Sequence, residues 1–309
     1  MLDYAHLSAL AAVVRTGSFE RAAQHLNVTP SAISQRIKLL EERLGVVLVV
    51  RGQPCTATEV GQRLCQHVEQ VAMLESCLHE SLPGLGAASR PATLRIAVNA
   101  DSLATWFIPA MARTEGYLFD LVLDDQDHSA EWLRRGEVAA AVTAHSTPVQ
   151  GCDCHPLGAL RYVATASPGY CSRWFADGVS ERAAARAPCL TFNQKDRLQA
   201  EWLRQVFGAD IHPPLHRLPS SQAFVDAALA GIGWGMNPEP LVIDHLRTGR
   251  LVALRPDQPL DIPLFWQQSR IVGSVLAPLT RAVMREAGRF CREPEAETSS
   301  SAPQEWKQL

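Results

Sequence analysis

Four polar side chains in one short stretch of the chain suit contact with double-stranded DNA: Ser31, Ser34, Gln35 and Lys38. Their spacing places them on one face if the stretch is helical. Short hydroxyls, a planar amide and an amine can reach base edges and phosphates in a major groove. The alternative is an ordinary solvated helix face, which would more naturally carry Glu together with Lys. We predict that this face reads DNA.

The helix that carries these groups is predicted to begin at Pro30. Thr29 can cap its N-terminus, and a proline at the first helical position loses no hydrogen bond there. Four aliphatic residues at helical spacing predict a buried stripe on the opposite side: Ile33, Ile37, Leu40 and Leu44. Burial of this stripe would leave the polar face exposed.

Two further helices are predicted before this one, and they must supply the surface that buries the stripe. The first runs from Tyr4 to Arg15 and ends at Gly17, and the second, "FERAAQHL", follows a Ser18 cap. Three short helices with a tight turn before the third form a helix-turn-helix. The β-branched stretch "VVLVVRGQPCTAT" then predicts a two-stranded wing with Arg51 at its tip, unless Arg51 is an ordinary turn residue.

A long linker is predicted next, because residues 58–82 read as one helix. Its apolar residues recur near a heptad: Val60, Leu64, Val68, Val71, Leu74 and Leu78. A rod of more than roughly 30 Å with a lone apolar stripe needs a partner helix. We therefore predict a dimer whose two recognition helices lie about one DNA turn apart. "PGLGAASRPA", residues 83–92, has the composition of a flexible hinge.

From Thr93 onward, short apolar runs alternate with helical patterns, which predicts two α/β lobes with parallel strands. The expected fold class is α+β multidomain: a winged helix-turn-helix, a long linker helix and a two-lobed α/β effector domain. A last helix near residues 276–291 is expected to return to the first lobe. The predicted boundaries are 1–58 for the DNA-binding domain, 59–89 for the linker and hinge, 90–163 with 266–292 for lobe I, 164–265 for lobe II, and 293–309 for a disordered tail.

A ligand site is predicted where the strands of the two lobes end, because helix N-termini point there in open α/β folds. The candidate contacts are Asn99, Asp101, Ser102 and Asp124 in the first lobe, and Asn193, Ser221 and Phe224 in the second. Ser102 and the helix amides beyond it can hold a carboxylate, whereas Asp101 or Asp124 can pair with a cation. The alternative is a helix cap at Asp101 and a solvated turn at Asp124. Two acids at neighbouring strand ends favour a cationic ligand.

Composition excludes several classes of protein. Of the 309 residues, 47% are hydrophobic and 20% charged, and no apolar stretch is long enough to span a bilayer. The N-terminus lacks the features of a secretory signal, so we expect a cytoplasmic protein whose eight cysteines are reduced. "CDCH", residues 152–155, is interpreted as a surface turn before a strand rather than a metal site, because no second ligand pair is evident. No metal site and no cofactor are predicted.

The charge distribution restricts any nucleic-acid contact to one part of the chain. The net charge is −3, whereas the first 58 residues carry six basic and four acidic side chains. Bulk attraction to DNA is therefore excluded, and the contact must be local.

With these elements in order, the chain resembles the LysR-type transcriptional regulators. The resemblance rests on "GSFERAAQHLNVTPSAISQRIKLLEERLGVVLVVR" followed by "TATEVGQ", and it extends over the chain apart from the tail. It implies a winged helix-turn-helix, a dimerising linker helix, an effector domain like periplasmic binding proteins, and assembly as homodimers or homotetramers that act with RNA polymerase. It also implies that the DNA-facing residues are those named above, with Arg51 near phosphate.

Three further segments are similar to the ArgP/LysG branch of that family: "LRIAVNADSLATWF", "EWLRRGEVAAAVTA" and "PLGALRYVA". This similarity implies a regulator that senses L-lysine or L-arginine and activates an amino-acid exporter gene. Three alternatives stay open: an enzyme, for which no glycine-rich or nucleophile motif is found; a ligand-independent architectural DNA binder; and a LysR-type regulator with a different small-molecule inducer.

Overall fold

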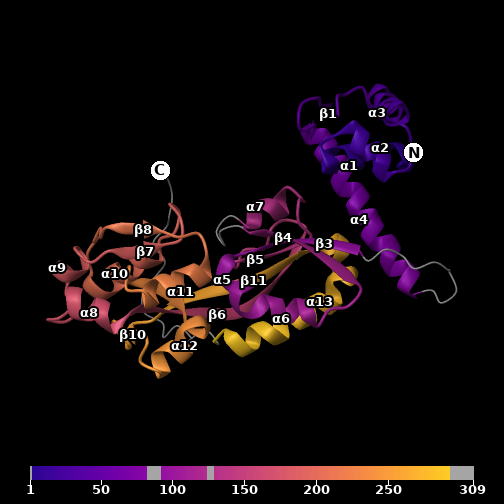
Figure 1. Ribbon diagram of the computed structural model, residues 1–309. Coiled ribbons are helices and arrows are strands. Elements are labelled where there is room, and N and C mark those ends of the chain that lie inside the picture. The colour runs from indigo at the N-terminus through magenta and orange to yellow at the C-terminus, as the bar shows by residue number, and fades with distance from the viewer. Residues whose placement is uncertain (1, 82–91, 124–128, 293–309) are drawn as a thin grey trace.

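The computed structural model describes residues 2–81, 92–123 and 129–292, and it divides into an N-terminal unit, a rod-like helix and a larger C-terminal part (Figure 1). The N-terminal unit consists of α1 (Tyr4–Thr16), α2 (Phe19–His25), α3 (Pro30–Leu44), β1 (Val49–Val50) and β2 (Thr56–Ala57). The predicted tail 293–309 and most of the predicted hinge lie outside the described residues.

Local capping produces the boundaries of the three helices, as predicted. Gly17 ends α1 with a φ of 67°, a left-handed conformation that suits glycine. The hydroxyls of Ser18 and Thr29 accept hydrogen bonds from backbone N–H groups in the first turns of α2 and α3. Pro30 is the first residue of α3, so the third helix begins where the sequence predicted.

A small hydrophobic core holds the three helices together. Ile33, Ile37 and Leu40 of α3 are buried with residues of α1 and α2. Leu44 differs from the prediction, because its side chain is 37% exposed. It is the last residue of α3, where the chain turns away at Gly45 with a φ of 69°. The wing is present as the antiparallel pair β1–β2.

Helix α4 (Glu59–Ser81) is the predicted linker, and it packs onto the C-terminal part. The Gln66 side-chain amide donates a hydrogen bond of 2.6 Å to the carbonyl oxygen of Arg135. Met73 is buried within the core of the C-terminal part. Leu74 and Leu78, in contrast, expose 40% and 56% of their surface. Part of the apolar stripe on α4 is therefore uncovered within this chain.

One mixed sheet forms the backbone of the C-terminal part. Its strand order is β10-β6-β11-β5-β3-β4, and β9 also pairs with β6. The strands are β3 (Ala92–Val98), β4 (Tyr117–Leu123), β5 (Ala140–Thr143), β6 (Cys152–Ala166), β9 (Gly235–Pro238), β10 (Val252–Ala253) and β11 (Leu260–Ser269). A separate pair is formed by β7 (Cys189–Thr191) and β8 (Leu215–Arg217). Strand β3 is parallel to both β4 and β5, which confirms the parallel strands predicted for the first lobe. The sheet as a whole is not parallel, because β11 pairs antiparallel with both β5 and β6.

Helices group around this sheet into two lobes. The first lobe contains β3 to β5 with α5 (Ala100–Ser102), the π-helix η1 (Leu103–Phe107), α6 (Ile108–Ala112), α7 (Ser129–Arg134), the 3-10 helix η2 (Arg270–Val272) and α13 (Gly273–Phe290). The second contains β7 to β10 with α8 (Pro168–Trp174), α9 (Glu181–Ala184), α10 (Leu198–Phe207), α11 (Ser221–Leu229) and α12 (Glu239–Arg247). Helix α13 packs on α6, η1 and β11, so the last helix returns to the first lobe as expected.

Strands β6 and β11 join the lobes, because both run through them as one antiparallel pair (Figure 1). The predicted lobe boundaries, 163/164 and 265/266, fall inside these two strands. "CDCH" is not a surface turn but the start of β6, where Cys152 to His155 pair with β11. Pairing with Trp266 to Ser269, the last residues of β11, extends the strand back to this point. No helix in the described part of the chain has the length and apolar composition that crossing a membrane requires.

Candidate DNA interface and effector cavity

The predicted DNA-reading face is present on α3. The side chains of Ser31, Gln35 and Lys38 are exposed, and that of Ser34 is half-buried. The Ser31 hydroxyl lies 2.9 Å from that of Thr29, and the Lys38 amine lies 3.7 Å from the Glu42 carboxylate. An exposed ion pair of this length is weak, so Lys38 is available to a phosphate.

Arg51 follows directly after β1, on the wing. Its guanidinium is exposed and lies 5.6 Å from the ring centroid of Phe19, the first residue of α2. A cation–π contact of this kind restrains the wing arginine beside the helix-turn-helix without removing its charge from solvent.

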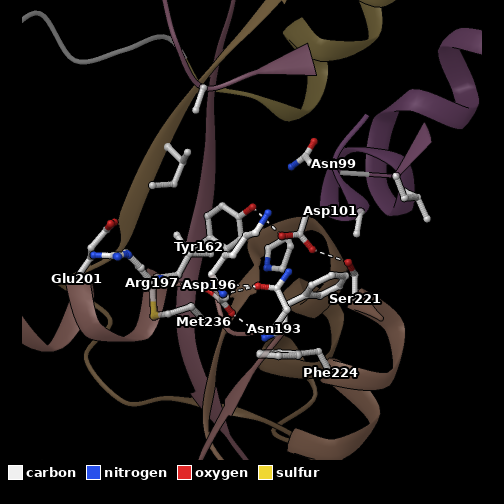
Figure 2. A pocket seen from close by; sticks show the side chains of 18 of the residues that line it. Asn99, Asp101, Tyr162, Asn193, Asp196, Arg197, Glu201, Ser221, Phe224 and Met236 are labelled. Atoms are coloured by element: carbon white, nitrogen blue, oxygen red, sulfur yellow. Dashed lines mark hydrogen bonds between the residues drawn. The ribbon is translucent and has the colours of Figure 1, made fainter. Parts of the chain in front are cut away.

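A cavity of about 390 Å³ lies between the two lobes. Five of the predicted ligand residues line it: Asn99, Asp101, Asn193, Ser221 and Phe224. Ser102 is fully buried and does not line the cavity. Asp124 lies outside the described residues. The fold therefore brings most of the predicted set together from both lobes, as Figure 2 shows.

Asp101 lies where the two lobes meet. Its Oδ2 accepts a hydrogen bond of 2.8 Å from the Tyr162 hydroxyl, and its Oδ1 accepts one of 2.6 Å from the Ser221 hydroxyl (Figure 2). Asp101 belongs to α5 in the first lobe, Tyr162 to β6, and Ser221 is the first residue of α11 in the second lobe. The carboxylate is thus held from both sides of the cavity.

The loop between β7 and α10 forms the opposite wall, and its shape depends on two side chains. The Asn193 amide oxygen accepts hydrogen bonds from the N–H groups of Lys195 and Asp196, at 2.7 and 3.0 Å. The Asp196 carboxylate accepts from the N–H groups of Phe192 and Leu198, at 2.8 and 3.1 Å. Asn193 therefore uses its carbonyl oxygen to build the loop.

Five further residues with polar or charged side chains line the cavity and were not predicted: Tyr162, Lys195, Asp196, Arg197 and Glu201. Tyr162 lies in an apolar strand, where its pattern indicates core. The charged residues belong to a polar loop and a helix start, which are common on any surface. With Asp101, the cavity has three carboxylates and two cationic side chains. Such a site can bind a small zwitterion that has an additional positive charge.

Both units match known families. Residues 4–62 match the model described as "Bacterial regulatory helix-turn-helix protein, lysR family", and residues 87–288 match "LysR substrate binding domain". The chain belongs to the LysR family of transcriptional regulators. The predicted fold class, with its helix-turn-helix and two-lobed effector domain, is confirmed.

This LysR-family chain is similar to regulators of the ArgP/LysG group. It is 45% identical over 293 residues to the HTH-type transcriptional regulator ArgP of Pseudomonas fluorescens (strain Pf0-1), which covers 94% of this chain and 98% of the relative. The crystal structure of ArgP from Mycobacterium tuberculosis is 44% identical, with a TM-score of 0.81, and covers 95% of this chain and 100% of that one. Full-length LysG from Corynebacterium glutamicum with bound effector Arg is 36% identical, with a TM-score of 0.70, and the match covers 94% of this chain and 100% of LysG.

Three cysteines of this LysR-family chain lie in environments that disfavour thiolate chemistry. Burial raises the pKa of Cys65, Cys189 and Cys291 to about 12. The thiolate is the metal-binding and nucleophilic form, so these groups are poor ligands and nucleophiles at neutral pH. Within residues 2–81, 92–123 and 129–292, no three His, Cys, Asp or Glu side chains gather closely enough to hold a metal ion.

Proposed function

We propose that this LysR-family regulator binds L-arginine or L-lysine in the cavity between its lobes and, in response, controls transcription of an amino-acid exporter gene. The observation that supports this most directly is the gathering of three carboxylates, Asp101, Asp196 and Glu201, around one interlobe cavity. The similarity to LysG, whose structure contains bound Arg, supports the same ligand class.

The charges of the cavity suit both ends of a basic amino acid. Asp101, held at the boundary of the lobes, would bind a cationic group of the effector. Lys195 and Arg197 on the opposite wall would bind its carboxylate. Phe224 supplies an apolar surface for the aliphatic part, together with Asn99 and Ser221 as polar neighbours. Ser102, buried behind the wall, has no direct part in this arrangement.

DNA would be bound by the N-terminal unit. In this proposal α3 enters the major groove, Ser31, Ser34, Gln35 and Lys38 face bases and phosphates, and Arg51 contacts phosphate from the wing. The exposed apolar stripe of α4 would pair with a second copy, and dimers would associate into tetramers that work with RNA polymerase at the promoter. The protein would act in the cytoplasm, where its DNA lies.

Regulation would come from the different affinities of the effector for two arrangements of the lobes. Residues of both lobes line the cavity, so ligand contacts to both favour the closed arrangement. A coupling free energy of about 1–3 kcal/mol between effector and DNA binding would change DNA affinity by about 5- to 150-fold.

A thermal-shift comparison of the twenty amino acids tests the effector class. Arginine and lysine are expected to stabilise the full chain, by about 2.7 kcal/mol at a hundredfold excess over Kd. Citrulline, which is close to arginine in size and lacks the guanidinium charge, is the matched control and is expected to stabilise less. Stabilisation by acidic or aromatic amino acids alone would show that the carboxylates do not bind a cation.

A further inference from the structure

Tyr162 is a deeply buried residue whose hydroxyl bonds the Asp101 carboxylate. Its side chain lines the interlobe cavity, yet only 1% of the residue is exposed. Its hydroxyl points at Asp101 and donates the hydrogen bond of 2.8 Å to Oδ2 (Figure 2). This tyrosine thus belongs to the core of the C-terminal part, and its hydroxyl reaches from that core to the wall of the cavity.

The position of Tyr162 is fixed by the sheet. In β6 it pairs with Leu260 of β11 on one side and with Pro238 of β9 on the other. Ser221, the second donor to Asp101, begins a helix of the second lobe. Because the joining strand β11 and the second-lobe strand β9 both hold Tyr162 in register, its hydroxyl has a fixed position beside Asp101 at the junction of the lobes.

The Tyr162 hydroxyl is suited to be a permanent hydrogen-bond donor. Burial raises its pKa well above the usual range, and the nearby Asp101 and Asp196 carboxylates raise it further. The hydroxyl therefore stays protonated at neutral pH. A half-buried carboxylate needs such donors, because charge removed from water is costly unless it is hydrogen-bonded.

We propose that Tyr162 is a positioning residue for the effector: its hydroxyl orients the Asp101 carboxylate toward the interlobe cavity, so that the carboxylate meets the cationic group of the bound amino acid. This role rests on the proposed function, and it adds to that function the residue that holds Asp101 in position for the cationic group of the effector. A carboxylate can accept about four hydrogen bonds, so donation by Tyr162 and Ser221 does not prevent Asp101 from also accepting bonds from an ammonium or guanidinium group.

Tyr162→Phe tests this role, because it removes only the hydroxyl. Isothermal titration of the full chain with L-arginine is expected to show an affinity that is weaker by up to about tenfold, since a hydrogen bond to a charged group is lost. Tyr170→Phe is the matched control. Tyr170 is 3% exposed, and its hydroxyl bonds the Pro188 carbonyl oxygen in the second lobe, outside the cavity. Its loss is expected to leave the arginine affinity unchanged.

A double-mutant cycle separates positioning from a general structural effect. If Tyr162 acts through Asp101, Tyr162→Phe is expected to cause no further loss of arginine affinity in an Asp101→Asn background. Additive losses, or equal losses in Tyr162→Phe and Tyr170→Phe, would overturn the inference. If the wild-type chain binds arginine and Tyr162→Phe binds it with the same affinity, the role of Tyr162 is overturned while the proposed function stands. A wild-type chain that binds neither arginine nor lysine would overturn the proposed function and this role with it.

Discussion

Ser31, Gln35 and Lys38 are exposed because Ile33 and Ile37, on the other side of the same helix, are buried against α1 and α2. A residue at i+4 returns to nearly the same face, so the aliphatic spacing decides which polar groups remain outside. At this scale the sequence sufficed for the polar face. The half-buried Ser34 shows what the sequence did not predict, because the packing of neighbouring helices sets how exposed each side chain is.

Gln35→Ala is the residue-scale prediction for DNA binding. If the amide reads a base edge, its loss is expected to weaken binding to the cognate promoter by about 1–3 kcal/mol, with a smaller effect on unrelated DNA. Gln222→Ala, at an exposed position of α11 in the second lobe, is the control. Fluorescence anisotropy with both DNAs measures the difference, and an unchanged preference for the promoter would remove Gln35 from the base-reading set.

Helix α4 has one face packed on the C-terminal part and another that is exposed. Gln66 and Met73 attach it to the C-terminal part of the same chain, whereas Leu74 and Leu78 are exposed. The heptad pattern predicted one continuous apolar stripe. In the structure this stripe divides, because Leu64 and Val68 pack on the core of the N-terminal unit whereas Leu74 and Leu78 are exposed. The spacing alone does not distinguish the two groups, because packing within the chain and pairing with a second α4 both need apolar residues.

Leu74→Lys tests the pairing of α4 at the scale of the element. A charge placed on the exposed stripe is expected to shift the protein from dimer or tetramer toward monomer, since pairing would bury an unpaired ammonium. Glu75→Lys, at the adjacent exposed position, introduces the same ammonium beside the stripe. Sedimentation velocity over a range of concentrations measures the oligomeric state of both variants. The same oligomeric state in both would mean that the interface lies elsewhere.

At the scale of the whole molecule, the charge is arranged so that DNA attraction is local. The chain carries a net charge of −3, yet the proposed DNA face presents Lys38 and Arg51. DNA affinity is therefore expected to fall steeply with salt, and Lys38→Ala is expected to reduce the slope of log K against log salt by about one. Arg247→Ala, an exposed arginine of α12 in the second lobe, is the control. A slope unchanged by Lys38→Ala would mean that this amine contacts no phosphate.

The sequence alone determined the features that depend on near neighbours along the chain. The caps at Gly17, Ser18 and Thr29, the polar face of α3 and the alternation of strands and helices follow from short-range periods and from residue types at helix ends. Asp101 could be proposed for the same reason, because it lies in the short segment that follows a predicted strand.

Only the tertiary structure decided which groups surround the effector cavity. Tyr162 and Ser221 stand 61 and 120 residues from Asp101, and they meet it through the register of β6 and the docking of α11. Ser102, next to Asp101 in sequence, instead faces the interior, because one residue along a helix rotates the side chain by about 100°. Local periods set which way a side chain faces along its own element, whereas contact between distant elements depends on how the two lobes pack around β6 and β11.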